Sequence, residues 1–337
     1  MSTPHADSTG TFDSARRAMQ RMLSGTSTND EVRAFLLAYN ERHATADELA
    51  GFLDAVRNAA TPIELPSDIA ERSIDIVGTG GDKSGSVNVS TMAALVVAGV
   101  GVPVCKHGNR SASSKCGTAD VLEALGARIE QTATQVSRTV TKVGFGFVFA
   151  PAFHPAFRHV GPIRRELGVP TIFNVIGPMA NPANVAHMLV GVADPQRLST
   201  MSKVLATRTR TSWVVHGNGG LDELSLAGPN RVVASRRGFP EEEMIVDAGA
   251  VGLAPAPNET LVGGDASHNA RVVRGVVTGE LRGAIRDVVV LNAAAALVVA
   301  GAARDLENGV LLATASIDSG TARATLDAYI AETTLNT

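Results

Sequence analysis

The chain has 337 residues, of which 45% are hydrophobic and 19% are charged, a composition typical of a globular protein with a sizeable core. Its formal net charge of −3 disfavours a general binder of nucleic acid or of acidic membranes, because such proteins carry a broad basic field. Two cysteines make neither a disulfide framework nor a zinc cluster, and the longest apolar run, at 291–303, is too short to span a bilayer. We therefore expect a cytoplasmic protein without nucleic-acid or membrane partners.

Residues 12–60 are expected to form three helices with apolar residues at helical spacing. Two of these helices begin with the signature of a capping box, Thr28 with Glu31 and Thr45 with Glu48. Small helices with an apolar face must bury it against something. Either the rest of the chain or a second copy of these helices is expected to cover them.

From residue 73, after a proline-containing linker at 61–66, short Val- and Ile-rich segments alternate with helical patterns. The expected strands are 74–78, 101–108, 126–130, 146–151, 188–193, 212–217 and 231–235. This alternation predicts an α/β domain with a mainly parallel central sheet flanked by helices. Polar clusters follow several of these strands, at the sheet edge where such folds bind ligands. Residues 280–330 are expected to be helical and structural.

The first polar cluster, "GTGGDKSGSVNVST" at 78–91, lies between a strand and an apolar helix. A glycine-rich turn before a helix N-terminus directs backbone N–H groups at an anion, so the cluster indicates phosphate binding. It does not fit the dinucleotide fingerprint, because Lys83 replaces the third glycine. It does not fit the P-loop either, because Asp82 would repel phosphate. A flexible turn is the alternative interpretation.

The second cluster, "KHGNRSASS" at 106–114, repeats this arrangement between a strand and a helix at 119–125. Its cations and hydroxyl groups suit a polyanion held at close range. For this cluster alone, a solvated basic loop is about as good an interpretation. Two such loops, each following a strand of one sheet, favour phosphate.

A third cluster extends from 154 to 182, and a helix from about His154 to Leu167 is expected to carry Arg164 near its end. Arg164 either complements the helix dipole or forms a fork for a substrate carboxylate. His154 and His159 are not on the same helix face, so metal ligation by this pair is disfavoured.

The fourth cluster, "VHGNGGLDE" at 215–223, ends a strand with a glycine turn followed by two adjacent carboxylates, Asp222 and Glu223. Their mutual repulsion would be relieved by Mg²⁺, which binds one or two carboxylates together with phosphate oxygens. A surface acidic turn is the alternative. Next to two phosphate loops, the metal interpretation is preferred.

In this order, the four clusters resemble the anthranilate phosphoribosyltransferase family, within the nucleoside phosphorylase-like phosphoribosyltransferases. The matching segments are "GTGGD" (78–82), "NVST" (88–91), "KHGNRSASS" (106–114), "GTADVLEALG" (117–126), the stretch 154–182 and "VHGNGGLDE" (215–223). The resemblance extends from residue 12 to about 330. Two positions depart from the family pattern: Lys83, where glycine is usual, and Cys116, where a small hydroxyl residue is usual.

The resemblance implies an enzyme of tryptophan biosynthesis, a pentosyltransferase that moves the phosphoribosyl group of 5-phosphoribosyl diphosphate to the amine of anthranilate and releases pyrophosphate. It implies a helical, dimerising domain at 1–66 with roughly 154–184, and an α/β domain at 70–153 and 185–337, with the active site between them. It further implies a homodimer, and a Mg²⁺ cofactor with two ions per subunit.

The resemblance also assigns residues to ligands. Those expected to bind 5-phosphoribosyl diphosphate are Gly78, Gly81, Asp82, Ser86, Asn88, Ser90, Thr91, Lys106, Ser114 and Thr118. Those expected to bind anthranilate are Gly78, His107, Asn109 and Arg164, and those expected to bind metal are Ser90, Asp222 and Glu223. No residue is expected to act as acid or base, because pyrophosphate is already a stable leaving group. Charge stabilisation by Mg²⁺ and Lys106, together with alignment, is expected to provide catalysis.

Three alternatives remain. A pyrimidine-nucleoside phosphorylase is disfavoured, because its lysine loop runs KHS-x-GG rather than "KHGNR". A non-catalytic nucleic-acid-binding paralogue is disfavoured by the acidic net charge and by the intact Asp-Glu pair and acceptor residues. A phosphoribosyltransferase for another aromatic amine stays open, given Lys83, Cys116 and Phe157.

Overall fold

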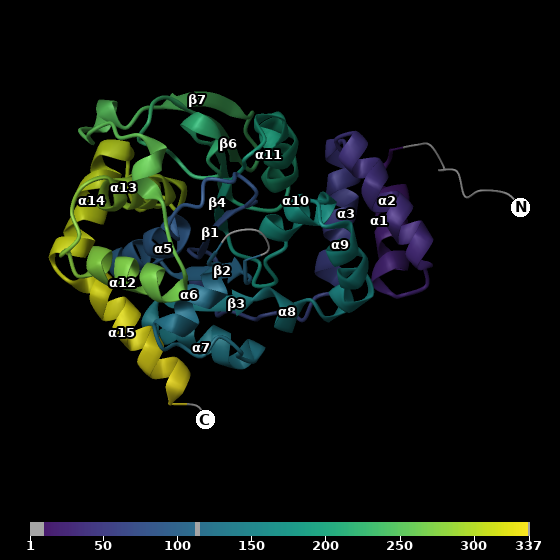
Figure 1. Cartoon of the computed structure of the whole chain (residues 1–337), viewed down its shortest axis with the longest axis horizontal. Helices are drawn as coiled ribbons and strands as arrows, with labels where there is room; N and C mark the ends of the chain where they lie inside the picture. The colour runs from purple at the N-terminus through teal and green to yellow at the C-terminus, as the bar shows by residue number, and fades with distance from the viewer. Residues whose placement is uncertain (1–9, 112–114, 336–337) are drawn as a thin grey trace, which may run out of the picture.

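A computed structural model describes residues 10–111 and 115–335 (Figure 1). The three expected N-terminal helices are present as α1 (Phe12–Leu23), α2 (Asn29–Glu41) and α3 (Ala46–Asn58). Both expected capping boxes form, at the first turns of α2 and α3. Figure 1 shows these helices together at one end of the molecule, beside α9 (Gly161–Leu167) and α10 (Ile172–Met179).

A seven-stranded sheet forms the centre of the molecule, in the order β3-β2-β1-β4-β5-β6-β7. Its strands are β1 (Ile74–Gly78), β2 (Val104–Gly108), β3 (Phe145–Phe149), β4 (His187–Gly191), β5 (Thr211–His216), β6 (Asn230–Arg236) and β7 (Glu242–Val246). The first five strands pair in parallel, and β6 and β7 continue the sheet antiparallel. The predicted fold class, a small helical part with a mainly parallel α/β sheet, is confirmed.

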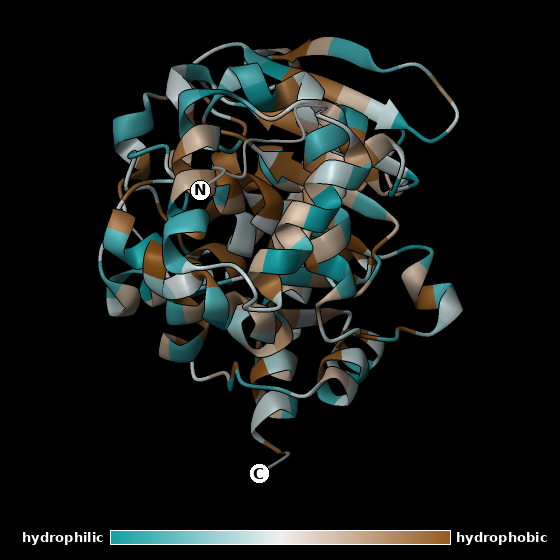
Figure 2. Cartoon of the chain, turned by 90° about the vertical axis from the view of Figure 1, so that its right-hand side faces the viewer, coloured by the Kyte–Doolittle hydropathy of each residue, from teal (hydrophilic) through white to brown (hydrophobic). Residues whose placement is uncertain are grey.

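Each face of the sheet has its own apolar core, because successive side chains of a strand point to opposite faces. Val104 and Phe147 face one core, and Cys105 and Val148 face the other. The first core is covered by α5 (Val89–Val100), α12 (Ala266–Val277), α13 (Ala284–Val299), α14 (Leu306–Asp318) and α15 (Thr321–Thr334). The second is covered by α7 (Ala133–Val143), α10, α11 (Leu198–Ala206) and the N-terminal helices. Hydrophobic segments accordingly gather on the central strands in Figure 2.

The N-terminal helices are joined to the sheet by this second core and by backbone hydrogen bonds. The linker N–H groups of Thr61 and Ile63 donate to the carbonyl oxygens of Phe153 and Pro182, at 2.8 and 3.3 Å. Helix α3 contacts both α10 and α11, and α2 contacts α9. The apolar faces expected from the sequence are thus covered in part by this chain itself.

The structure corrects three expectations about elements. Residues 126–130 form no strand; Ile129 is buried under α15, and the Arg128 N–H donates to Thr333 Oγ1 at 3.2 Å. The helix expected from His154 to Leu167 is divided into a 3₁₀ helix, η1 (Pro155–His159), and α9, each with a proline in its first turn. Strand β7 was not expected.

The remaining helices are α4 (Ser67–Ala70), α6 (Thr118–Ala124) and α8 (Ala150–Phe153). Within the described residues, every helix is too short or too polar to cross a bilayer.

Candidate active site

The first and fourth polar clusters meet at the carboxyl ends of β1, β4 and β5. Gly78 and Gly191 end their strands as a pair, and the turn that carries Asp222 lies on both of them. A Cβ on Gly78 would clash with the Asp222 carboxylate, and a Cβ on Gly191 would clash with the Asp222 carbonyl group. Both positions need glycine so that the acidic turn can approach the sheet. From the sequence, Gly78 was expected to contact ligands, and no motif pointed to Gly191.

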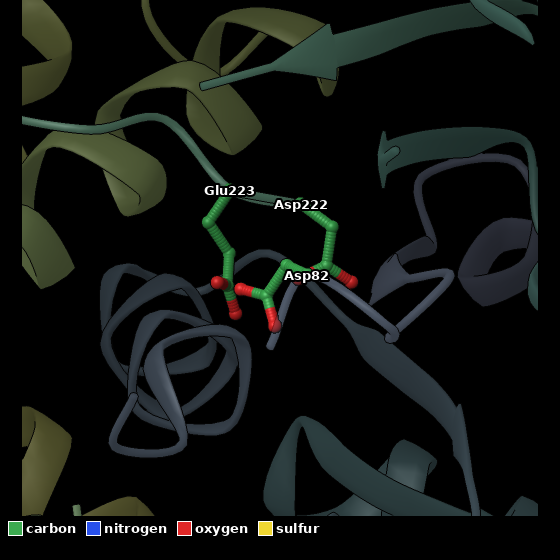
Figure 3. A group of neighbouring side chains, drawn as sticks. All are labelled: Asp82, Asp222 and Glu223. Carbon is green, nitrogen blue, oxygen red and sulfur yellow. The ribbon is translucent and has the colours of Figure 1, made fainter. Parts of the chain in front are cut away.

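Three carboxylates converge at this point (Figure 3). Asp82, Asp222 and Glu223 each offer an oxygen, and these oxygens lie within 4.8 Å of one another. The Gly80 N–H donates to Asp222 Oδ2 at 2.6 Å, and Ser84 donates its N–H and hydroxyl to Asp82 at 3.2 and 2.6 Å. The loop thereby places Asp82 beside the acidic pair. The sequence analysis had assigned Asp82 to the sugar diphosphate.

Burial and repulsion between neighbouring carboxylates make Asp222 and Glu223 hard to ionise. Burial raises the pKa of Asp222, and the nearby charge of Asp82 raises it further. The pKa of Glu223 is raised by burial first, and then by Asp222 and Asp82. An added cation would remove this penalty. Clustered carboxylate oxygens are the ligands of hard divalent cations, so the residues present fit the expected Mg²⁺.

Lys106 lies next to this cluster and is 1% exposed. Its Nζ donates to Ser90 Oγ at 3.1 Å and to the carbonyl oxygen of Ile76. Burial lowers the pKa of the Lys106 ammonium, while Asp75, Glu223 and Asp222 act in the opposite direction. The hydrogen bond from Lys106 therefore holds Ser90, an expected metal ligand, close to the acidic cluster.

The glycine-rich loop is fixed against residues 261–263. The Val87 N–H donates to Leu261 O and the Gly263 N–H to Gly85 O, both at 2.8 Å, and Ser86 forms a β-bridge with Val262. Lys83 has a left-handed φ of 58°, a conformation that favours glycine, and its side chain is exposed. This explains in backbone terms why glycine is usual at this position.

The second loop packs against the first. The amide of Asn88 donates to Cys116 O at 3.2 Å, and its oxygen accepts from Asn269 at 2.9 Å. The hydroxyl groups of Thr91 and Thr118 lie 3.4 Å apart. These contacts place the expected phosphate residues of both loops side by side. Ser114 lies outside the described residues. Gly81 has a left-handed φ of 82° and is exposed.

His107 points to the opposite face from Lys106 and contacts a second histidine. Its Nδ1 lies 3.2 Å from the carbonyl oxygen of Gly177, and its Nε2 lies 3.2 Å from His154 Nε2. Burial lowers the pKa to about 3 for His107 and to about 4 for His154, so both rings are neutral at pH 7. Since a carbonyl only accepts, the His107 proton is on Nδ1, and His154 donates from Nε2.

A series of aromatic contacts connects the histidine pair to Arg164. The Phe157 ring stacks on His154 at 4.9 Å, Phe173 meets Phe157 edge-on at 5.2 Å, and the Arg164 guanidinium lies 5.0 Å from the Phe173 ring centre. Arg164 Nε is buried without a hydrogen-bond partner among the described residues, and burial lowers the pKa of this guanidinium. An unpaired, partly buried guanidinium favours the carboxylate-fork interpretation over a dipole-capping one.

Asn109 shapes the second loop. Its Oδ1 accepts the N–H of Arg110 at 2.7 Å, and its carbonyl oxygen accepts the N–H of Ala119 at 3.2 Å. Within the described residues its side-chain NH₂ donates no hydrogen bond, which leaves it available to a ligand.

Asp75 and Asn181 support the site and were missed by the sequence analysis. Asp75 is fully buried in β1 and accepts from the His107 N–H at 3.1 Å and from Asn181 Nδ2 at 2.9 Å. Burial raises the pKa of Asp75 to about 6, although Lys106 lowers it. A carboxylate inside an otherwise apolar strand was the sequence feature that could have identified Asp75. Asn181 lies 106 residues further along the chain, and no local sequence pattern pointed to it.

Two models of known protein families match this chain. A model of the glycosyl transferase family a/b domain matches residues 70–323, and a model of its helical bundle domain matches residues 9–60. Together they define a glycosyl transferase with a helical bundle and an α/β sheet.

Individual relatives show which glycosyl transferase family the chain belongs to. The anthranilate phosphoribosyltransferase of Roseiflexus castenholzii is 46% identical, over 97% of this chain and 95% of that protein. That of Rhodopseudomonas palustris is 48% identical, over 95% of this chain and 94% of that protein. The crystal structure of the Thermus thermophilus enzyme has a TM-score of 0.90 at 41% identity, covering 96% of this chain and 95% of that one. The chain belongs to the anthranilate phosphoribosyltransferase family.

Proposed function

We propose that this site transfers the 5-phosphoribosyl group of phosphoribosyl diphosphate to the amine of anthranilate, with release of pyrophosphate, as a step of tryptophan biosynthesis. The observation that carries the proposal is the convergence of Asp82, Asp222 and Glu223 beside buried Lys106. A Saccharomyces cerevisiae anthranilate phosphoribosyltransferase in complex with PRPP and Mg has a TM-score of 0.88 at 27% identity, covering 96% of this chain and 94% of that one. Another structure of the yeast enzyme holds 4-fluoroanthranilate.

The first part of the site would bind the sugar diphosphate. Backbone N–H groups of the glycine-rich loop that are free of internal hydrogen bonds would donate to the diphosphate, and Lys106 would add a buried positive charge. When bound, Mg²⁺ supplies positive charge that stabilises the departing pyrophosphate. The residues that would hold it are Ser90, Asp222 and Glu223, with Asp82 alongside, and we expect two ions per subunit. The remaining residues of this part are Gly78, Gly81, Ser86, Asn88, Thr91, Ser114 and Thr118.

The second part would position anthranilate. Arg164 offers its buried Nε–H, which has no hydrogen-bond partner among the described residues, for the carboxylate. Neutral His107 contacts His154, on which the Phe157 ring stacks, and Asn109 would add its side-chain amide. An aryl amine attacks as the free base and loses its proton after the C–N bond forms. No residue of the chain therefore needs to act as a general base. Orientation and charge stabilisation would account for the acceleration.

We infer that residues 1–66 with roughly 154–184 form a helical domain, and that 70–153 with 185–337 form the α/β domain. Contacts of α9 and α10 with α2 and α3 support this division. We further infer a homodimer through the helical domain, since Phe12 and Leu37 remain exposed on it. A cytoplasmic location is supported by the two cysteines, which are buried and form no disulfide with each other, as suits a reducing compartment.

Loss of anthranilate fluorescence, with purified protein, phosphoribosyl diphosphate and Mg²⁺, tests the function. We expect a loss that EDTA abolishes. Absence of turnover while calorimetry shows phosphoribosyl diphosphate binding would point to another aromatic amine. Absence of both would contradict the proposal and favour a non-catalytic paralogue.

A further inference from the structure

Residues of α3, of the segment after α10, of β4 and of the segment that ends α11 line a cavity outside the candidate active site. Its polar lining includes Arg57, Asn184, Arg208 and Thr209, and its apolar wall includes Met179 and Met188. The space open to the centre of a water-sized sphere is about 30 Å³. One water needs roughly 10–15 Å³ on this measure, so the cavity has room for a larger polar group.

Positive charge in this cavity exceeds negative charge. Arg208 forms an ion pair with Asp54, at 3.5 Å, and the other oxygen of Asp54 accepts from Asn58 at 2.9 Å. The guanidinium of Arg57 has neither an ion pair nor a hydrogen bond within the described parts of the chain. Burial lowers the pKa of Arg57 to about 10, with Arg208 acting in the same direction and Asp54 against it. Two partly buried guanidinium groups thus lie near a single carboxylate, which is paired with only one of them.

Asn184 adds a neutral donor beside these cations. It is one of two non-glycine residues with a left-handed φ, at 51°, in the parts of the chain that the structure describes. Such conformations are sparsely populated and often occur where the backbone serves a ligand. The Thr209 hydroxyl donates to Leu205 O at 2.9 Å, so the donors that this lining offers to an anion are the guanidinium groups and the Asn184 amide.

We propose that this cavity is a binding site for a small oxyanion, held between Arg57 and Arg208, with inorganic phosphate as the simplest occupant. A tetrahedral oxyanion would pair with two guanidinium forks, which bind phosphate in bidentate geometry. It would also supply a second negative charge, because Asp54 alone balances only one of the two guanidinium groups. The proposal goes beyond the transferase function, because none of these side chains belongs to the candidate active site.

The site adjoins the active site through a single residue. Asn181 also lines the cavity, and its Nδ2 donates to Asp75 at 2.9 Å and to Cys105 O at 2.8 Å. Asp75 in turn accepts from the His107 N–H. Occupancy of the cavity would therefore stabilise the segment that supports the acceptor side.

Calorimetric titration with inorganic phosphate, in EDTA and low chloride, tests the proposal. The wild-type protein should show a binding event that is weakened roughly tenfold or more in both Arg57→Met and Arg208→Met, because each loses one charge-assisted pair. Arg210→Met is the matched control, since Arg210 lies two residues from Arg208, is exposed and is outside the cavity. It should bind as the wild type does. Identical isotherms for all four proteins would assign any phosphate binding to the glycine-rich loop and overturn the proposal.

Thermal unfolding separates a ligand-binding arginine from a structural one. Without phosphate, Arg57→Met should unfold at a higher temperature than the wild type, because an unpaired, partly buried charge has been removed. With phosphate, the order should reverse, because only the wild type gains from binding. A lower midpoint for Arg57→Met in both buffers would show a structural role and contradict the proposal.

Discussion

Lys106 and His107 follow one another along β2, and strand alternation sends their side chains to opposite faces of the sheet. Lys106 contacts Ser90, whereas His107 contacts His154. In the proposed reaction, one face holds the diphosphate and the other holds the amine. One pair of residues at the end of a single strand therefore fixes the two halves of the site relative to each other.

Arg164→Ala should raise the KM for anthranilate by about 10–100-fold, if a charge-assisted fork worth ~1.5–3 kcal/mol is lost. The KM for phosphoribosyl diphosphate should change little. Arg165→Ala is the matched control, because Arg165 is the next residue of α9 and its side chain is exposed. Steady-state kinetics with each substrate varied in turn measures this difference. Equal anthranilate KM values for the two variants would remove Arg164 from the acceptor site.

Because of the acidic cluster, we expect protein stability and Mg²⁺ affinity to change with pH in opposite directions. Since the pKa of Asp222 is raised in the folded state, the native protein binds more protons than the unfolded chain above about pH 4. The stability of the metal-free protein should therefore fall as pH rises through the raised pKa. Mg²⁺ affinity should rise by about tenfold per pH unit for each proton displaced, until the carboxylates are ionised.

Thermal unfolding in EDTA and in Mg²⁺, at several pH values, measures both effects. Asp222→Asn should flatten the pH slope in EDTA and reduce the stabilisation by Mg²⁺. Asp68→Asn, at an exposed carboxylate of α4, should change neither. A stabilisation by Mg²⁺ that is independent of pH, or that Asp222→Asn retains in full, would place the metal elsewhere.

Motifs within one stretch of sequence were predictable, and supports built from distant residues were not. The two loops and the Asp-Glu turn were identified because spacing and strand context are local. The contact of Asp75 with Asn181 depends on a sheet register and on the segment after α10, which no local pattern encodes. Gly191 could not be predicted for the same reason. It must be glycine because the turn that carries Asp222, which follows a different strand, packs directly on it.

At the scale of elements, the same capping box appears on α2 and α3 with different burial. On α3, Glu48 is 3% exposed, accepts from Thr45 and Tyr39, and pairs with Arg42 through both of its oxygens at 2.6 and 2.9 Å. On α2, Glu31 is exposed. The Arg42 hydrogen bond, opposed by burial, lowers the pKa of Glu48 to about 2. The box on α3 is therefore also a buried polar network.

Glu48→Gln should lower the free energy of unfolding by ~1–3 kcal/mol, less than for a fully buried pair because Arg42 is half exposed. Glu31→Gln should lower it by less than ~1 kcal/mol. Because the Glu48 carboxyl has a lowered pKa, its contribution is present above about pH 4.5 and is lost as pH falls toward 2. Urea unfolding at pH 7 and pH 3 measures this, and equal losses in the two variants would contradict it.

The elements that were predicted incorrectly differ from the expectation for separate physical reasons. Residues 126–130 have strand-like alternation, yet Ile129 buries itself against α15 and needs no strand partner. Pro155 and Pro162 each restart the chain in a new helical turn, so the apolar pattern of 154–167 extends over two helices. Strand β7 lies at the sheet edge with its glutamates exposed, which weakens the pattern that predicts strands.

At the scale of the whole molecule, the helical end and the sheet share one apolar core. Met19 and Leu36 of the N-terminal helices belong to the same buried cluster as Met188 and Val190 of β4. Arg208, just after α11, also pairs with Asp54 of α3, at 3.5 Å. A core that is continuous across both parts should make them unfold together, although they are expected to be separate domains.

Leu36→Ala tests this coupling. Leu36 is fully buried, so the substitution should lower the free energy of unfolding by ~2–5 kcal/mol. The chain has one tryptophan, Trp213 in β5, and it faces the other core. If unfolding is cooperative, the urea midpoint followed by Trp213 fluorescence should fall together with the midpoint followed by circular dichroism. Leu311→Ala, at a side chain that is 67% exposed, should leave both unchanged. An early transition by circular dichroism with an unchanged Trp213 midpoint would show that the helical part unfolds independently. The loss of packing at Leu36 would then leave the stability of the sheet unchanged.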